Sequence, residues 1–152
     1  MEILYEDNHI IIVNKQAGEI IQGDKTGDRT VADEIKAYLK EKYNKPGAVF
    51  LGIPHRLDRP VSGVSIFART SKALARLNEM FRKGEIEKTY QAIVIHEPQI
   101  ASGTLEHWLT RNEKQNKAYA DKAPQKNAKK AILDYKVEAK SDRYWLINVQ
   151  LQ

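Results

Sequence analysis

The sequence contains no cysteine, which excludes disulfide bonds, thiolate zinc sites and a cysteine nucleophile. No apolar run approaches the length that crosses a bilayer, and the first residues lack the basic segment of a secretory signal, so we expect a cytoplasmic protein. There is no glycine-rich phosphate loop and no G-x-G-x-x-G pattern. The four histidines do not follow metal-ligand spacing. Nucleotide cofactors and metals therefore have no support in the sequence.

What the sequence does contain is an ordinary globular composition with an excess of positive charge. It is 152 residues long, of which 41% are hydrophobic and 30% are charged, enough for one domain with a core. The formal net charge is +5. A moderate basic excess favours a polyanionic partner such as RNA or DNA.

Apolar periodicity and turn residues predict an α+β fold. We expect one helix from Thr30 to about Tyr43 and a second from Thr70 or Ser71 to a stop at Gly84. Strands are expected at residues 3–5, 10–13, 64–68, 89–95, 105–109, 131–138 and 143–151. The pattern favours a mixed, mostly antiparallel sheet with the helices packed on it.

Residues 111–130 lack periodicity and are rich in lysine, which is typical of a long basic hairpin or a mobile loop. Such a segment can contact a nucleic-acid backbone through its lysines. The candidates for phosphate contacts are Lys114, Lys117, Lys122, Lys126, Lys129 and Lys130.

The stretch from residue 54 to residue 64 is the strongest candidate for a reactive site. Asp58 lies in it between two arginines, Arg56 and Arg59, and nearby positive charge favours the ionised form of an acid. The residues that exclude a regular helix here are Pro54, Pro60 and Gly63. The pattern alone leaves two interpretations open. Asp58 is either a reactive carboxylate positioned just before a strand, or part of a surface turn with a weak salt bridge.

Four blocks in order resemble the RluA family of pseudouridine synthases. The run His-Arg-Leu-Asp-Arg at residues 55–59, followed by Ser-Gly, is similar to the catalytic loop of that family. The opening block at residues 3–15, the Lys-Thr-Tyr-Gln-Ala block at residues 88–92 and the Ala-Lys-Lys-Ala block at residues 128–131 also match it. The four blocks are distributed over nearly the whole length of the chain.

This resemblance implies an RNA isomerase (an intramolecular transferase) in which Asp58 is the essential aspartate. The reaction breaks the C1′–N1 bond of a uridine, turns the uracil and rejoins it through C5, without cofactor or metal. A carboxylate can serve either as a nucleophile or as a base that removes a sugar proton, and both roles stay open. The expected partner is rRNA or tRNA.

The resemblance also implies residues that bind the substrate. By it, Tyr90 stacks on the target base and Arg56 helps to occupy the place of a base flipped out of a helix. Lys15 and Lys88 become candidates for backbone phosphates. The full expected set is Tyr90, Arg56, His55, Arg59, Lys15 and Lys88.

The chain also departs from the family pattern. Gln16 stands where the first block usually has proline, and Pro60-Val61 replaces a pair that ends in threonine. The Thr-Gly-Arg and His-Gln-Ile-Arg segments of the family do not follow the last strand, and the family's partner arginine for the aspartate is among them. We therefore expect residues 1–152 to be the N-terminal portion of one catalytic domain, without a separate N-terminal RNA-binding domain.

Two consequences are expected from that reading. The chain alone would be weakly active or inactive, and an unpaired terminal strand would promote self-association. An RNA-binding module without catalysis is the alternative function. Another aspartate enzyme, such as a glycosidase or phosphatase, needs a second positioned carboxylate or a metal cluster, and neither is evident.

Overall fold

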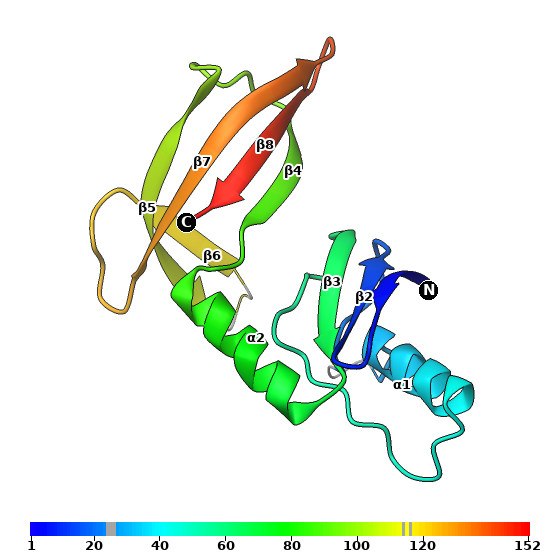
Figure 1. Cartoon of the computed structure of the whole chain (residues 1–152). Helices are drawn as coiled ribbons and strands as arrows, with labels where there is room; N and C mark the ends of the chain where they lie inside the picture. Colours follow the sequence, from blue (N-terminus) through cyan, green and yellow to red (C-terminus); the bar gives the residue numbers. More distant parts are fainter. Residues whose placement is uncertain (24–26, 114, 116) are drawn as a thin grey trace. The chain divides into compact units, whose positions relative to one another are not determined.

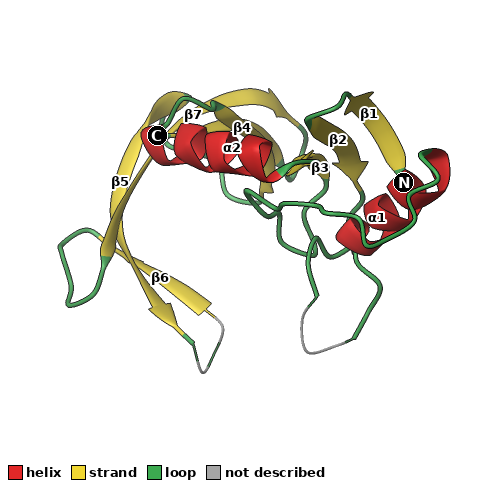
Figure 2. Cartoon of the chain, turned by 60° about the horizontal axis from the view of Figure 1, so that its bottom comes forward, coloured by secondary structure: helices red, strands yellow, loops and turns green. Residues whose placement is uncertain are grey.

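The computed structural model describes residues 1–23, 27–113, 115 and 117–152. They divide into two compact units, Met1–Glu85 and Ile86–Gln152. Figure 1 labels the elements along the chain and Figure 2 colours them by type. The expectation of one catalytic domain over residues 1–152 stays a prediction.

The first unit contains a three-stranded antiparallel sheet in the order β1-β2-β3. Its elements in the described chain are β1 (Glu2–Glu6), β2 (Ile10–Lys15), α1 (Val31–Lys42), β3 (Gly63–Ala68) and α2 (Ser71–Lys83). β2 alternates between buried and half-buried residues, because successive side chains of a strand point to opposite faces. One face of this sheet therefore meets a core.

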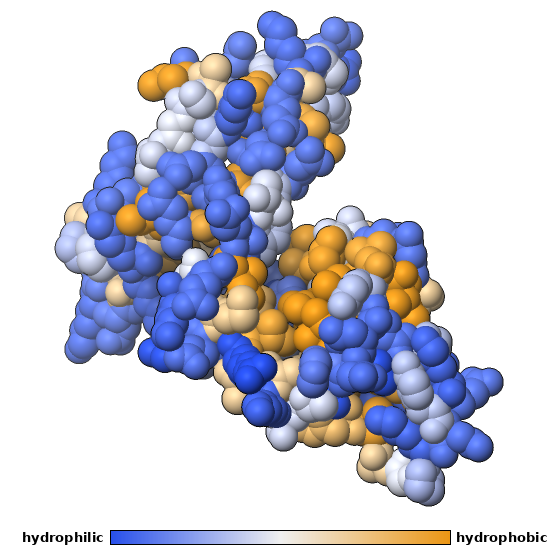
Figure 3. Space-filling view, viewed as in Figure 1, coloured by the Kyte–Doolittle hydropathy of each residue, from blue (hydrophilic) through white to orange (hydrophobic). Residues whose placement is uncertain are grey.

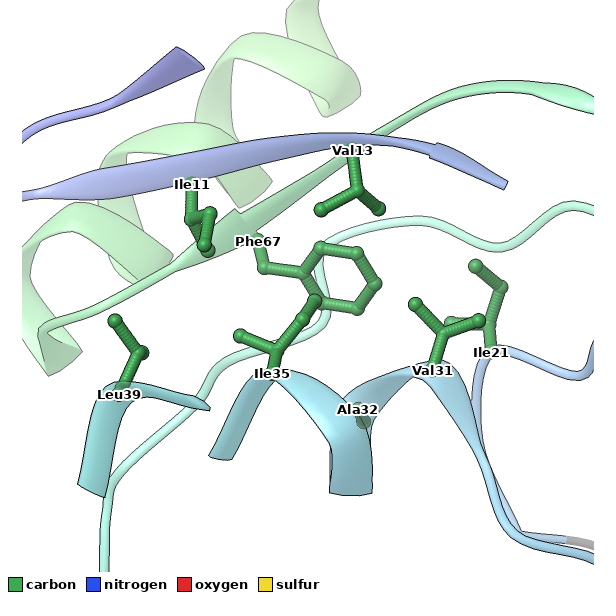
Figure 4. Close-up of a cluster of buried hydrophobic side chains, with 8 residues drawn as sticks. All are labelled: Ile11, Val13, Ile21, Val31, Ala32, Ile35, Leu39 and Phe67. Atoms are coloured by element: carbon green, nitrogen blue, oxygen red, sulfur yellow. The ribbon is translucent and has the colours of Figure 1, made fainter. Parts of the chain in front are cut away.

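That core lies between the sheet and α1, as Figure 4 shows. Ile35 and Leu39 of α1 pack with Phe67 of β3, and all three are at most 1% exposed. The complete cluster is Ile11, Val13, Ile21, Val31, Ala32, Ile35, Leu39 and Phe67. Burying one such side chain contributes about 1.5–3 kcal/mol, so this cluster is the main apolar stabilisation of the unit.

The opposite face of the same sheet carries apolar side chains that are half-buried or exposed. Ile12 lies opposite Ile66 in register, and Val64 is 61% exposed. In the space-filling view, hydrophobic residues gather over the part of the unit that carries β2 and β3 (Figure 3).

Threonines cap both described helices, at Thr30 as predicted and at Thr70, one of the two residues that the sequence left open. The Thr30 hydroxyl accepts the N–H of Asp33 (3.0 Å), and the Asp33 carboxylate accepts the N–H of Thr30 (3.2 Å), which completes a capping box. The Thr70 hydroxyl accepts the N–H of Ala73 (3.1 Å). Gly84 ends α2 with φ +70°, a left-handed conformation that glycine adopts without strain. These boundaries confirm the sequence prediction.

The second unit is a five-stranded antiparallel sheet in the order β4-β8-β7-β5-β6. Its strands are β4 (Lys88–Val94), β5 (Ser102–Asn112), β6 (Lys117–Asp121), β7 (Lys129–Lys140) and β8 (Trp145–Leu151). With the helices of the first unit, these antiparallel strands confirm the predicted α+β class. No helix in the described residues is long and apolar enough to cross a membrane.

The five-stranded sheet has an apolar face and a polar face. Tyr90, Val149 and Tyr135 lie opposite one another on neighbouring strands, on the face where an apolar groove is found. On the other face, the Gln91 amide donates to the Glu138 carboxylate (2.9 Å). None of the described residues of this unit is as deeply buried as the core of the first unit.

Two predictions about strands have different outcomes. Of the two alternatives for residues 111–130, a hairpin forms in the first part of the segment, where β6 pairs with residues 108–112 of β5; the candidate Lys114 lies outside the described residues. The predicted unpaired terminal strand is wrong. β8 pairs with β7 on one side and with β4 on the other. The last strand of the chain thus lies inside the sheet, next to a strand that comes many residues earlier in the sequence. The outer strands of this sheet are β4 and β6.

Candidate active site

The loop that carries Asp58 starts beside the edge of β3. Gly52 and Ala68 exchange two backbone hydrogen bonds, of 2.8 and 2.9 Å. A Cβ at residue 52 would lie 2.8 Å from Leu74 Cδ2 of α2, so only glycine fits between the strand and the helix without a shift. The helix packing and the strand edge together fix where the loop begins.

Lys15, the last residue of β2, holds the middle of the loop from within the protein. Its side chain is 0% exposed. The ammonium Nζ donates to the backbone carbonyls of Gln16 (3.1 Å), Asp58 (3.1 Å), Arg59 (3.3 Å) and Val61 (2.5 Å). A buried ammonium is tolerated when oxygen acceptors surround it, and here those acceptors are the backbone of the loop itself.

The charge on Lys15 also lies within the electrostatic reach of Asp58. Burial lowers the pKa of the Lys15 ammonium, while the nearby carboxylates of Glu19 and Asp58 act in the opposite direction. The Asp58 side chain itself is exposed. The loop thus presents an exposed carboxylate on a backbone that is held by a buried cation.

A second backbone contact and an ion pair hold Arg59. The N–H of Gly18, at φ +93°, donates to the Arg59 carbonyl (2.7 Å). The Arg59 guanidinium lies 2.5 Å from the Asp28 carboxylate, which ties the loop to the segment before α1. The loop also closes on itself, since the N–H of Val61 donates to the Asp58 carbonyl (3.0 Å).

The other predicted site residues fall into two places. His55 is half-buried at the start of the loop, and its Nε2 accepts the N–H of Ile66 (3.0 Å). The Arg56 side chain is exposed one residue later. Tyr90 and Lys88 lie on β4 of the second unit and are half-buried there. The first unit therefore brings together five of the predicted residues in one loop and the strand end that supports it.

The sequence predicts that Lys15 contacts a phosphate, and it does not predict that Lys15 is buried and binds the carbonyls of the loop. A signal for it was present, because Lys15 continues the alternation of Ile11 and Val13, and these alternate residues point to the buried face of β2. The sequence does not reveal that residue 52 must be glycine, because the steric reason is its contact with Leu74, which lies far along the chain. Within the described ranges, no three His, Asp or Glu side chains come together as metal ligands.

Comparison with known proteins identifies the family. The family model described as RNA pseudouridylate synthase matches residues 9–152. This chain belongs to that family. The match covers the Asp58 loop and confirms the resemblance of the four sequence blocks to pseudouridine synthases.

Similar curated proteins are also pseudouridine synthases. An uncharacterized RNA pseudouridine synthase of Chlorobaculum parvum is 35% identical over 156 residues, which cover 98% of this chain and 47% of that protein. Ribosomal large subunit pseudouridine synthase C of Escherichia coli is 38% identical over 92 residues, covering 60% of this chain and 27% of that protein. The chain spans at most about half the length of these relatives.

Two solved structures share the fold. They are the human proteins RNA Pseudouridylate Synthase Domain Containing 4, with a TM-score of 0.80 and 22% identity, and Domain Containing 1, with a TM-score of 0.76 and 20% identity. Each match covers 99% of this chain and 58% of the solved chain. The chain therefore has the fold of pseudouridylate synthase domains.

Proposed function

We propose that this chain supplies the Asp58-bearing part of an RNA pseudouridine synthase, which converts a uridine of rRNA or tRNA to pseudouridine. The main support for the proposal is that a chain of this family carries an exposed aspartate on a loop whose backbone is held in place. Asp58 is exposed, and its backbone carbonyl accepts a hydrogen bond from the buried Lys15 ammonium. An exposed carboxylate on a fixed backbone can meet a substrate in one orientation.

The reaction is an isomerisation, so its atoms balance without a co-reactant. The C1′–N1 bond of the uridine breaks, a C1′–C5 bond forms, and the hydrogen lost from C5 is matched by one gained at N1. Asp58 acts either as a nucleophile on the sugar or as a base that takes a sugar proton. Each role uses the ionised carboxylate, and each works without cofactor or metal.

An exposed carboxylate on a loop limits which uridines can be substrates. A uridine stacked in a helix cannot be attacked, so the target base is flipped out or lies in a single-stranded loop. In this proposal Tyr90 stacks on the base, while Arg56 fills the space that the base leaves. Lys88 contacts a phosphate. Since the Escherichia coli relative carries the words ribosomal large subunit in its name, rRNA is the favoured RNA in this proposal, and the reaction takes place in the cytoplasm with the ribosome.

The basic hairpin of the second unit supports an RNA partner. Its lysines are exposed around β6 and in the turn that follows, at Lys117, Lys122, Lys126 and Lys129. Lys130 differs, because its ammonium lies 2.9 Å from Glu106. Exposed lysines that neutralise phosphates release counterions and make RNA binding depend on salt.

The test is a map of pseudouridines in the rRNA and tRNA of the source organism, with Asp58→Asn introduced at the chromosomal gene. This uses the natural protein, of whatever length, in its own cell. Asp142→Asn is the matched control, because Asp142 is another exposed aspartate, in the turn between β7 and β8. We expect at least one site to lose pseudouridine with Asp58→Asn only. An unchanged map refutes the proposal.

The same strains separate catalysis from binding. If RNA co-purifies with the protein but no pseudouridine depends on Asp58, the chain is an RNA-binding module. Because residues 1–152 correspond to 47% of the Chlorobaculum parvum relative, we expect these residues alone to turn over more slowly than the natural protein.

A further inference from the structure

The outer edge of β3 presents backbone N–H groups that need acceptors. β3 is the last strand of its sheet, and successive backbone groups of a strand point to opposite sides. The N–H of Ala68 points away from β2 and donates to the Gly52 carbonyl (2.9 Å). The N–H of Ile66, two residues earlier, has the same direction and donates to His55 Nε2 (3.0 Å). Residues 52–55 thus cover this edge.

The acceptor for Ile66 is a side chain because the backbone leaves the edge between residues 52 and 55. At Gly52 the two chains are close enough to exchange hydrogen bonds in both directions. At His55 an imidazole bridges the remaining distance. Its ring also packs against Phe81 of α2, with 5.0 Å between ring centroids and 33° between planes, a favourable tilted contact. The ring therefore sets the spacing between the loop and β3.

The next anchor along the loop lies beyond His55, at the Asp58 carbonyl that Lys15 binds. Only Arg56 and Leu57 separate the imidazole from Asp58. A displacement of the His55 backbone thus reaches Asp58 across a short segment. Reacting groups must be held closely, since an error of about 1 Å can reduce a rate about 10²-fold.

We propose that His55 is a positioning residue: its Nε2 holds the incoming part of the loop against β3 and thereby orients the Asp58 carboxylate. The hydrogen bond and the ring contact are internal to the protein, which distinguishes this role from the substrate contact that the sequence analysis expects. The effect on the reaction rests on the proposed function of Asp58. The effect on the loop does not.

Two amide variants test whether the hydrogen-bond acceptor at residue 55 is what matters, independently of the imidazole ring. Gln in His55→Gln places a carbonyl oxygen near the position of Nε2, whereas Asn in His55→Asn is one methylene shorter and does not reach Ile66. His55→Phe keeps a ring for Phe81 but has no acceptor. The first measurement is hydrogen exchange of the Ile66 amide in the full-length protein purified from the source organism. The Ala68 amide is the internal control for folding of the same edge.

We expect the Ile66 amide to exchange about tenfold faster in His55→Asn and His55→Phe, a factor that corresponds to the net strength of one hydrogen bond. Exchange in His55→Gln should stay within about threefold of wild type. Ala68 exchange should be unchanged in all three variants. Equal Ile66 exchange in His55→Asn and wild type overturns the proposal, whatever the protein catalyses.

The second measurement is turnover of the RNA whose modification depends on Asp58. We expect kcat to fall about tenfold or more in His55→Asn and His55→Phe, with KM within about twofold, and His55→Gln to restore most of kcat. A raised KM with an unchanged kcat would assign His55 to substrate binding and overturn the positioning role. If Asp58→Asn also leaves modification unchanged, the proposed function fails, while the exchange experiment still decides the role of His55 in the loop.

Discussion

Replacing Lys15 with methionine tests how the Asp58 loop is held. Methionine keeps an unbranched stem of similar length and fits an apolar interior, so Lys15→Met removes mainly the ammonium. In the wild type that group donates to four carbonyls, three of them in the loop at residues 58–61. The substitution leaves these carbonyls facing an apolar side chain.

The expected loss of stability follows from the number of bonds that act at once. An ammonium has three N–H donors, so no more than three of the four contacts are full hydrogen bonds together. A hydrogen bond to a charged group contributes about 1.5–3 kcal/mol, but the methionine variant also avoids the cost of burying a charge. We expect Lys15→Met to lower the free energy of unfolding by about 2–4 kcal/mol.

Urea unfolding followed by far-UV circular dichroism measures this change. Tryptophan fluorescence is a poor probe for it, because Trp108 and Trp145 both lie in the second unit. Lys36→Met on the exposed side of α1 is the matched control and should change stability by less than about 0.5 kcal/mol. Hydrogen exchange of the Val61 amide should rise in Lys15→Met. A stability change as small as that of the control, with Val61 exchange unaltered, would refute the loop-holding role of Lys15.

Two further predictions concern the first unit. Burial acts to raise the pKa of Glu6, but hydrogen bonds from Lys42, Tyr43 and Tyr38 lower it to about 2 from its usual 4.5. The carboxylate is 8% exposed, so it contributes up to about 3 kcal/mol above pH 4.5, lost as the pH falls towards 2. Urea unfolding of Glu6→Gln should show a large loss of stability at pH 7 and less than half of that loss near pH 3; an equal loss at both pH values would contradict the linkage. Gly52→Ala places a methyl group against Leu74 and should destabilise by about 1–3 kcal/mol. Leu74→Val in the same chain should recover part of that loss, and simple additivity in the double-mutant cycle would exclude the contact.

Local chemistry explains most of what the sequence predicts correctly. Thr30 and Thr70 begin helices because a hydroxyl can accept an N–H of the first turn, and the nearby residues need no distant partner for this. Gly84 ends α2 for an equally local reason. Asp58 is exposed in a loop because prolines and a glycine prevent regular structure around it.

The features that the sequence does not predict depend on pairing across long distances. The order of strands in the second unit places β8 between β7 and β4, and apolar alternation within β8 is the same whether its edge is open or paired. For Lys15 the sequence predicts a phosphate contact, which needs an exposed side chain, and lysine is usually exposed. Its buried role requires the loop carbonyls at residues 58–61, which only the folded chain brings to it.

In the proposed function, the loop positions Asp58 through its backbone rather than through the aspartate side chain. Lys15 binds main-chain carbonyls, Gly18 binds the carbonyl of Arg59, and the Arg59 guanidinium binds Asp28. These contacts hold the chain at Asp58 and in the residues that follow it, and they leave the Asp58 carboxylate exposed. In the proposed reaction, the groups that position Asp58 are thus distinct from its carboxylate, which meets the substrate.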